Sequence, residues 1–372
     1  MTDICFIGGT GRSGTTILRR IFGRHPHVAA LRTEARFLID PDGLVDFWDT
    51  FKCGWSPYTF DIKIRRLEGL LRELGRTGSV GMVASALGMV GGGASKTNPT
   101  EPTRIRRRNA LKWAFSVDMR LARWLPRYPT VMLGEACPSY TELVDDLLAS
   151  LIQFKFEGRW TGTPRFQPST IFVGPRATDD DLAGLLGDFY RDVAGCIAAQ
   201  SGATHFVEDS PLNILSFDRI LELLPDARLV HIYRDPRDVV ASYSTMRWGP
   251  PDPAQTARLY ARIMEAWNLV RRKLPPESYL EVALEELVQN PKITLDKICN
   301  LWGLPWSDTL LDTDLSGSHS GRWKKDLTTH QQQAIMTVVQ PLLTSLGYAP
   351  TPPSASTGTL TRTGVEANSS HR

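Results

Sequence analysis

Short apolar runs alternate along the chain with longer stretches in which apolar residues recur at helical spacing. Five runs have the length and composition of buried strands: residues 4–7, 131–134, 205–207, 229–233 and 279–282. Strands that alternate with helices in this way are typical of an α/β fold in which helices cover a parallel sheet. We therefore expect a three-layer α/β fold with a central parallel sheet.

Two of these strands run directly into sequences that start helices. Ser210 and Pro211 have the residue types of an N-cap and a first helical position, and an apolar stripe follows them. Asp235 and Pro236 repeat the pattern after residues 229–233. These strand ends are therefore expected to lead straight into helix N-termini.

We expect one domain that spans residues 1–349. Within it, residues 45–200 lack the alternation of strands and helices and are predicted to form a largely helical insertion. Helical spacing is clearest at 62–75, 139–153 and 179–200. A glycine-rich piece at 91–99 and the arginines of 104–108 predict a loop, with a solvated surface favoured over an anion-gathering lid. The Thr, Ser, Pro and Gly content of residues 350–372 predicts a disordered tail.

Charge and cysteine content exclude several classes of protein. The 43 Lys and Arg residues against 40 Asp and Glu leave a net charge of +3, so a nucleic-acid partner is not expected. The five cysteines are far apart and form no C-x-x-C pair, which disfavours a disulfide framework or zinc knuckle and favours the cytoplasm. No apolar run reaches the ~20 residues of a membrane-spanning helix. The histidines have no metal-ligand spacing, so no metal site is expected.

The glycine-rich segment 8–16 lies between the first strand and a helix. This arrangement directs backbone N–H groups and the positive end of the helix dipole at one point, which suits a phosphate or sulfate group. Thr15 stands where a Walker A loop has lysine, so ATP or GTP hydrolysis is poorly supported. Arg12 is the cation here, placed to contact the oxygen between a transferred group and a leaving phosphate. The alternative is a glycine-rich turn with a surface arginine.

The segment Arg12-Ser13-Gly14-Thr15-Thr16 resembles the R/K-S-G-T-T loop of the sulfotransferase family. The continuation through His25-Pro26 and Glu34-Ala35-Arg36-Phe37 is similar to tyrosylprotein and bacterial sulfotransferases, with a spacing one residue longer than in the tyrosylprotein type. The resemblance implies a P-loop-like fold, 3'-phosphoadenylyl sulfate (PAPS) as donor, PAP as product and no metal. It assigns binding of the 5'-phosphosulfate to Arg12, Ser13, Gly14, Thr15 and Thr16.

Two further segments are similar to the nucleotide-binding parts of the same family. Arg234 at a strand end and Ser242 eight residues later have the spacing of its 3'-phosphate motif; the alternative is that Arg234 pairs with Asp238. The segment 318–327 is similar to a C-terminal G-x-W-K/R motif. The resemblance implies that Arg322 and Lys324 add charge near the 3'-phosphate and that Trp323 packs on the nucleotide. A core position for Trp323 is equally consistent.

In-line sulfuryl transfer requires a general base near the acceptor hydroxyl. The E-x-R resemblance assigns this role to Glu34; the alternative is a surface acid paired with Arg36. Glu208 and Asp209 are alternative bases at a strand end, whereas His205 is expected to be structural. Asp209 also replaces a lysine of the family that is thought to assist the leaving oxygen, so Arg12 acts alone or Lys112 of the insertion contributes the charge.

The resemblance therefore implies a PAPS-dependent sulfotransferase whose acceptor is a hydroxyl of a small molecule, a glycan or a peptide. A P-loop kinase would instead use ATP, with Thr15 or Thr16 on magnesium. A non-catalytic nucleotide-binding protein would keep Arg12, Arg234 and Ser242 without a working base. Acceptor choice and oligomeric state stay open, because neither is encoded in these motifs. Tryptophans of the insertion are candidates for its core or for an acceptor cleft: Trp48, Trp55, Trp113, Trp124 and Trp160.

Overall fold

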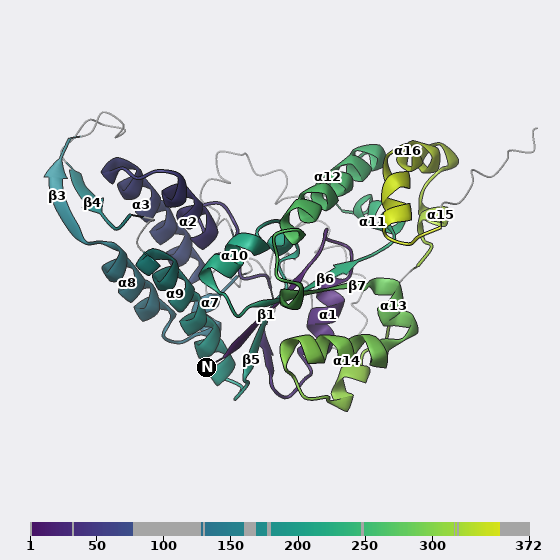
Figure 1. Ribbon diagram of the computed structural model, residues 1–372, viewed down its shortest axis with the longest axis horizontal. Helices are drawn as coiled ribbons and strands as arrows, with labels where there is room; N and C mark the ends of the chain where they lie inside the picture. Colours follow the sequence, from purple (N-terminus) through teal and green to yellow (C-terminus); the bar gives the residue numbers. More distant parts are fainter. Residues whose placement is uncertain are drawn as a thin grey trace, which may run out of the picture.

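A five-stranded parallel sheet lies at the centre of the computed structural model (Figure 1). The structure describes residues 2–31, 33–76, 128, 131–159, 169–176, 180–246, 249–315, 317 and 320–349. The strand order is β2-β5-β1-β6-β7, and every neighbouring pair is parallel. The strands are β1 (Asp3–Gly8), β2 (Val28–Ala30), β5 (His205–Glu208), β6 (Arg228–Tyr233) and β7 (Tyr279–Ala283). This confirms the predicted α/β fold class.

Side chains of β1 alternate between two helical layers, because successive residues of a strand point to opposite faces. Ile4 and Phe6 belong to a buried cluster that includes residues of α9, α10 and α12. Cys5 and Ile7 belong to a second cluster formed with α1 and α14. Helices therefore cover both faces, as a three-layer fold requires. The bounds are α1 (Thr15–Phe22), α9 (Asp180–Ala199), α10 (Phe217–Leu223), α12 (Pro253–Arg271) and α14 (Pro291–Trp302).

Of the remaining C-terminal helices, α11, α15 and α16 pack with α12, whereas Leu284 and Leu287 of α13 belong to the cluster formed with α1 and α14. Val240 of α11 and Trp323 of α15 share a third buried cluster with Ile335 and Val339 of α16. Asp235 caps α11 as predicted, since its carboxylate accepts from the Arg237 N–H at 2.9 Å. The bounds are α11 (Pro236–Tyr243), α13 (Leu284–Gln289), α15 (Trp323–Asp326) and α16 (Thr329–Ser345), with short 3-10 turns η2 (Pro276–Ser278) and η3 (Asp308–Leu311).

The helix expected directly after residues 205–207 is divided in two. A 3-10 helix, η1 (Pro211–Leu215), comes first, and α10 starts only at Phe217. Ser210 does not cap it, because its hydroxyl donates to Glu208 Oε1 at 2.5 Å. The Ser210 hydroxyl is thus directed at Glu208 and makes no hydrogen bond to the first N–H groups of the helix.

The described part of the insertion is mostly helical but contains a hairpin that the sequence pattern did not indicate. The helices expected at 62–75, 139–153 and 179–200 are confirmed as α3, α8 and α9, and the strand expected at 131–134 is wrong. Leu133 starts a short helix and is buried in the core; a four-residue apolar run suits either structure. The elements are α2 (Leu44–Cys53), α3 (Pro57–Leu74), α7 (Leu133–Ala136), α8 (Tyr140–Leu151), β3 (Phe154–Gly158) and β4 (Ser169–Val173).

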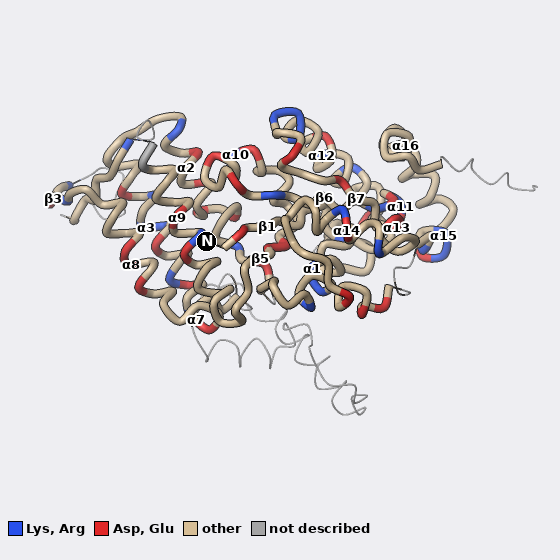
Figure 2. Tube along the Cα trace, turned by 60° about the horizontal axis from the view of Figure 1, so that its bottom comes forward, with Lys and Arg blue, Asp and Glu red and all other residues tan. Residues whose placement is uncertain are grey.

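Acidic and basic residues are interspersed along the described chain (Figure 2), in line with the small net charge. Within the described ranges, no helix combines the length and the apolar character needed to cross a bilayer. Several expectations fall on positions outside the described residues: the arginines of 104–108, Lys112, three of the tryptophans and the tail 350–372.

Candidate active site

The carboxyl ends of the five parallel strands bring the candidate residues together at one edge of the sheet (Figure 1). The loop with Arg12 follows β1, Glu34 follows β2, Asp209 follows β5, Arg234 follows β6 and Glu285 follows β7. Ligands of open α/β sheets bind at this edge. Residues more than 200 positions apart in the sequence therefore face one region.

The phosphate loop has a tightly constrained backbone. Gly11, Arg12 and Gly14 have positive φ values of 75°, 57° and 118°. A side chain at Gly9 would lie 2.6 Å from the Ile232 carbonyl, and one at Gly11 would lie 2.6 Å from the Tyr243 hydroxyl. The left-handed conformation of Arg12 costs roughly 1–2 kcal/mol. Close packing against β6 and α11 therefore fixes the loop in a conformation that suits its glycines and that Arg12 disfavours.

The loop presents its backbone, more than its hydroxyls, at the start of α1. Ser13 is fully buried and Thr15 nearly so, whereas Thr16 is exposed. The first turn of a helix leaves its N–H groups without internal acceptors, and the dipole adds positive potential. Tyr243 holds the loop from the other side, since its hydroxyl donates to the Thr10 carbonyl at 2.7 Å. The motifs gave no indication of this contact.

The two predicted phosphate sites adjoin one another. Arg12 Nε donates to Ser242 Oγ at 3.0 Å, which joins the first loop to α11. Partial burial lowers the pKa of Arg12, and the positive charges of Arg322 and Arg234 lower it further. Guanidinium groups from three separate segments therefore gather at the N-terminus of α1. Their mutual repulsion favours a ligand with more than one negative charge.

Asp238 organises the second phosphate site. Arg234 is buried, and its Nη2 lies 3.5 Å from Asp238 Oδ2, so the ion pair considered as the alternative does form. Asp238 is completely buried and also accepts from the N–H groups of Gly321 and Trp323, at 2.7 and 3.0 Å. This carboxylate thus ties the C-terminal segment to α11. The sequence pattern indicates Asp238 only as a partner of Arg234.

Residues 322–324 of that segment occupy different surroundings. Arg322 Nη2 pairs with Asp326 at 2.6 Å while lying close enough to Arg12 to lower its pKa. Trp323 is buried beneath the Arg237 guanidinium, which lies 4.6 Å from the ring centroid. Its position therefore matches the core position that the sequence left as an alternative. Lys324 Nζ lies 5.7 Å from the same ring and is exposed. Of the three, only Arg322 has an interaction with the Arg12 side of the site among the described residues.

Glu34 lies on the opposite side of the site in a network of paired charges. Its Oε2 is 2.5 Å from Arg36 Nη2, and about 30% of its side chain is exposed. Burial raises its pKa, Arg36 lowers it and Asp209 raises it again, so the net pKa is above the ordinary glutamate value. A carboxylate that is accessible, oriented by an arginine and more basic than usual is suited to accept a proton.

Glu208 holds the Glu34 loop in place. Its buried carboxylate accepts from Ala35 N at 3.1 Å, from Ser210 N at 3.0 Å and from the Ser210 hydroxyl, and it also contacts Asn213 Nδ2. Burial raises the pKa of Glu208 to about 7 despite these donors. Because four donors surround its two oxygens, Glu208 is a positioning residue and is poorly placed to reach an acceptor.

Arg19 supplies the positive charge beside Asp209. Its Nε lies 2.9 Å from Asp209 Oδ2, and its Nη1 donates to the Leu31 carbonyl at 3.1 Å. Asp209 is 5% exposed, and burial raises its pKa while Arg19 lowers it. An acid–arginine pair therefore stands at the position where the family has lysine. The motifs missed Arg19 because nothing in helical spacing shows which way this side chain turns.

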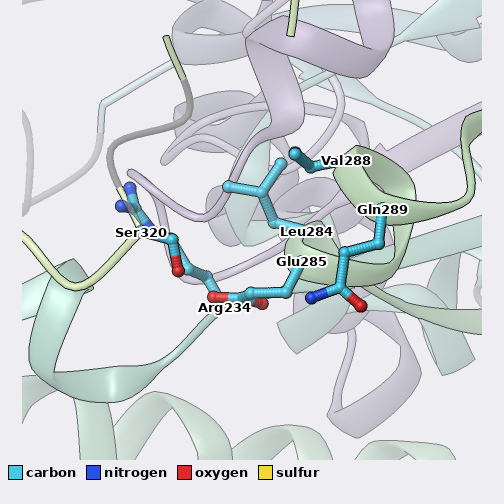
Figure 3. A pocket seen from close by; sticks show the side chains of 6 residues that line it. All are labelled: Arg234, Leu284, Glu285, Val288, Gln289 and Ser320. Atoms are coloured by element: carbon cyan, nitrogen blue, oxygen red, sulfur yellow. The ribbon is translucent and has the colours of Figure 1, made fainter. Parts of the chain in front are cut away.

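A small cleft of about 50 Å³ opens beside Arg234 (Figure 3). Leu284, Glu285, Val288 and Gln289 of α13 line one side of it, and Arg234 and Ser320 line the other. Leu284 and Val288 form the apolar part of this cleft, and its rim is polar. The Glu285 carboxylate is already engaged, since it accepts from Asp235 N at 3.2 Å and from the Tyr348 hydroxyl at 2.7 Å.

His205 is structural, as expected, because its ring is buried and its Nε2 lies 3.0 Å from the Trp302 carbonyl. It therefore points into the protein and away from the strand end. Within the described ranges, no group of three or more His, Cys, Asp or Glu side chains is arranged to bind a metal ion.

Residues 137–308 match the model of a protein family described as the sulfotransferase family. The match confirms the resemblance that the phosphate-loop motif indicated. The matched range includes Asp209, Arg234 and Ser242, and it excludes the loop with Arg12 as well as Glu34. The matched range thus includes the segment similar to the 3'-phosphate motif and leaves out the phosphate-loop and E-x-R segments. No protein with a curated description matches this sequence.

Solved sulfotransferase structures share the outline of the chain at low identity. The sulfotransferase domain of the Synechococcus PCC 7002 olefin synthase is 16% identical with a TM-score of 0.45, covering 94% of this chain and 96% of that domain. The sulfotransferase STF9 from Mycobacterium avium is 11% identical with a TM-score of 0.40, covering 94% of this chain and 78% of that one. Similarity at this level carries no argument about substrates.

Proposed function

We propose that this protein is a sulfotransferase that moves a sulfuryl group from PAPS to an acceptor hydroxyl and releases PAP. The observation that carries the proposal is the 3.0 Å contact between Arg12 Nε and Ser242 Oγ, which joins two anion-binding segments in one site. Arg234 and Arg322 add positive charge to the same region. A nucleotide with phosphates at both its 5' and 3' positions matches this charge distribution better than a linear triphosphate.

Each end of the donor has a corresponding group of residues. The N–H groups of residues 12–16 and the Arg12 guanidinium bind the 5'-phosphosulfate, where Arg12 stabilises charge developing on the leaving phosphate. Arg234, Ser242 and Arg322 bind the 3'-phosphate, since arginine offers a forked donor and serine a neutral one. The cleft beside Arg234, with apolar Leu284 and Val288, accepts an edge of the base. PAPS itself supplies the activated sulfuryl group.

Glu34 acts as the general base. Its carboxylate accepts the proton of the acceptor hydroxyl as that oxygen attacks sulfur, while the bond between sulfur and the phosphate oxygen breaks. Arg36 orients the carboxylate, and Glu208 fixes the backbone at Ala35 next to it. Burial raises the pKa of Glu34, which makes its ionised carboxylate a stronger base than an ordinary glutamate. The acceptor is a hydroxyl of a small molecule, glycan or peptide that binds on the Glu34 side.

The test is transfer of labelled sulfate from PAPS to pools of phenols, glycans, peptides and aliphatic alcohols. A parallel assay with ATP, labelled in its γ-phosphate, and magnesium covers the kinase alternative. We expect labelled sulfate in at least one pool, loss of that label with Glu34→Gln, and no labelled phosphate in any pool. Phosphate transfer without sulfate transfer would contradict the proposal. Tight PAP binding without transfer to any pool would favour a non-catalytic nucleotide-binding protein.

A further inference from the structure

The hairpin formed by β3 and β4 has one protected edge and one open edge. The strands are antiparallel, with Phe156 opposite Ile171, and β3 is the outermost element on its side of the molecule (Figure 1). On the β4 edge, the Phe172 N–H donates to Asp61 Oδ1 at 3.0 Å. The Thr170 carbonyl accepts from Arg65 at 2.6 Å. Side chains of α3 thus bind two of the outward-facing main-chain groups of β4.

The same contacts show which main-chain groups of β3 face outward. In an antiparallel pair, residues alternate between positions that bond to the partner strand and positions that face away from it. Phe172 and Thr170 face away from β3, so their partners Lys155 and Glu157 also direct their N–H and C=O groups outward. Within the ranges that the structure describes, no other strand pairs with this edge.

The outer strand also exposes two aromatic side chains. Phe154 and Phe156 are 57% and 40% exposed, whereas Val173 and Ile171, directly opposite on the same face, are 3% and 1% exposed. On this face of the hairpin, the side chains of β4 are therefore buried, whereas those of β3 are exposed to solvent. An unpaired strand with exposed apolar residues is a template for another strand.

We propose that a second copy of this chain pairs with the outer edge of β3, forming a four-stranded sheet across a two-fold axis at Phe156. In this register Lys155 of each copy lies opposite Glu157 of the other, and the two residues exchange their outward main-chain hydrogen bonds. Phe156 meets its own counterpart at a non-hydrogen-bonded position, where side chains approach closely.

Charge complementarity selects this register and this occupant. Shifting the pairing so that the axis falls at Lys155 sets lysine against lysine, and shifting it to Glu157 sets glutamate against glutamate. Only the register centred on Phe156 gives two opposite-charge pairs, and it does so because the segment Lys155-Phe156-Glu157 is self-complementary in antiparallel orientation. Five residues make a small interface, so the dimer depends on protein concentration.

Charge reversal tests the register by sedimentation equilibrium over a range of protein concentrations. Lys155→Glu and Glu157→Lys each place like charges opposite one another twice, so each variant alone should dimerise about tenfold more weakly than wild type. An equimolar mixture of the two variants restores both opposite-charge pairs and should recover the wild-type dimer affinity. Lys297→Glu, an exposed position on α14, is the matched control and should behave as wild type.

A wild-type protein that is monomeric at every concentration would overturn the proposal. Dimers that are unaffected by both single variants, or a mixture that fails to recover dimerisation, would do so as well. Phe156→Cys gives an independent readout, since Cα atoms ~4.5 Å apart at a non-hydrogen-bonded pair lie within the range that a disulfide spans. Because Cys53 is itself free and exposed, the variant is made in a Cys53→Ser background. Mild oxidation should cross-link Phe156→Cys in this background into dimers and leave Cys53→Ser alone unlinked; the absence of cross-linking would count against the register.

Discussion

Arg12 and Glu34, on the two sides of the active site, are held in opposite ways, although Arg234 and Arg322 beside Arg12 are themselves paired with Asp238 and Asp326. On the phosphate side, Arg12 contacts the neutral hydroxyl of Ser242 and is repelled by Arg322 and Arg234. No carboxylate among the described residues pairs with Arg12. On the Glu34 side, two carboxylates have arginine partners: Glu34 pairs with Arg36 and Asp209 with Arg19.

This difference corresponds to two different tasks. Crowded positive charges are relieved when an anion binds, so the phosphate side contributes binding energy that can be directed at charge developing on the leaving group. Paired charges are already oriented, so the Glu34 side holds a base in position before the acceptor arrives. Repulsion between arginines therefore lowers the stability of the folded protein on the phosphate side. On the Glu34 side, ion pairs orient the carboxylates.

Removal of Arg12 should have the largest effect. Arg12→Ala should lower kcat/KM for sulfate transfer about a thousandfold, because it removes the charge nearest the leaving oxygen. Steady-state kinetics with labelled PAPS measure the loss. Arg20→Ala, an exposed arginine on α1, which follows the loop, is the control and should keep wild-type activity. Equal losses of kcat/KM in the two variants would mean that the rate depends only on the net charge of the protein and would contradict a specific role for Arg12.

Removal of the base should reduce turnover and leave nucleotide binding intact. Glu34→Gln should lower kcat about a hundredfold, in the range that general-base catalysis contributes. PAP affinity should stay unchanged, because Glu34 belongs to the other side of the site. Asp40→Asn changes a neighbouring carboxylate that also pairs with Arg36 at 3.6 Å and should retain most of the rate. Full turnover by Glu34→Gln would assign the base elsewhere.

Loss of Asp238 should weaken the second phosphate site without touching the acceptor side. Asp238→Asn loses one of the two buried acceptors for Gly321 and Trp323 N–H groups, which should cost about 1–3 kcal/mol of stability. PAP affinity should fall about tenfold, as the segment with Arg322 loses its anchor. Chemical denaturation and calorimetric titration measure the two effects. Stability lost at unchanged PAP affinity would make Asp238 purely structural.

A smaller effect should appear in the pH dependence. Glu34 must be ionised to accept a proton, so kcat/KM falls as pH decreases through its raised pKa. The negative charge of Asp209 contributes to that increase; Asp209→Asn should therefore lower the pKa of Glu34 and move the acidic limb of the profile to lower pH. Asp296→Asn on the surface of α14 should leave the limb in place. A shift to higher pH with Asp209→Asn would contradict the assignment of Glu34.

Much of the local structure on the phosphate side could be predicted from the sequence, because the residues that determine it are close together in the chain. A strand, a glycine-rich loop and a helix start are contiguous in residues 4–22, and Asp235 caps α11 within one turn. The strand at 131–134 was wrong for the converse reason, since an apolar run of four residues carries no periodicity. The exposed strand β3 was missed because no buried stripe marks it.

The Glu34–Arg36 pair is local and was considered from the sequence, but two other contacts of the Glu34 side are long-range and left no local trace. Arg19 meets Asp209 across 190 positions, and Ala35 N meets Glu208 across 173. Sequence spacing placed Glu208 and Asp209 at a strand end, but it did not distinguish a buried anchor from an accessible base. That distinction depends on which donors surround each carboxylate, which only the folded chain determines.

The most direct test of the central claim is calorimetric titration of PAP and of ATP with magnesium into wild type, Arg12→Ala and Arg234→Ala. PAP should bind wild type more tightly than ATP with magnesium, and each substitution should weaken PAP binding, because the two arginines hold opposite ends of the same nucleotide. Tighter binding of ATP with magnesium, or PAP affinity unchanged by both substitutions, would contradict the account.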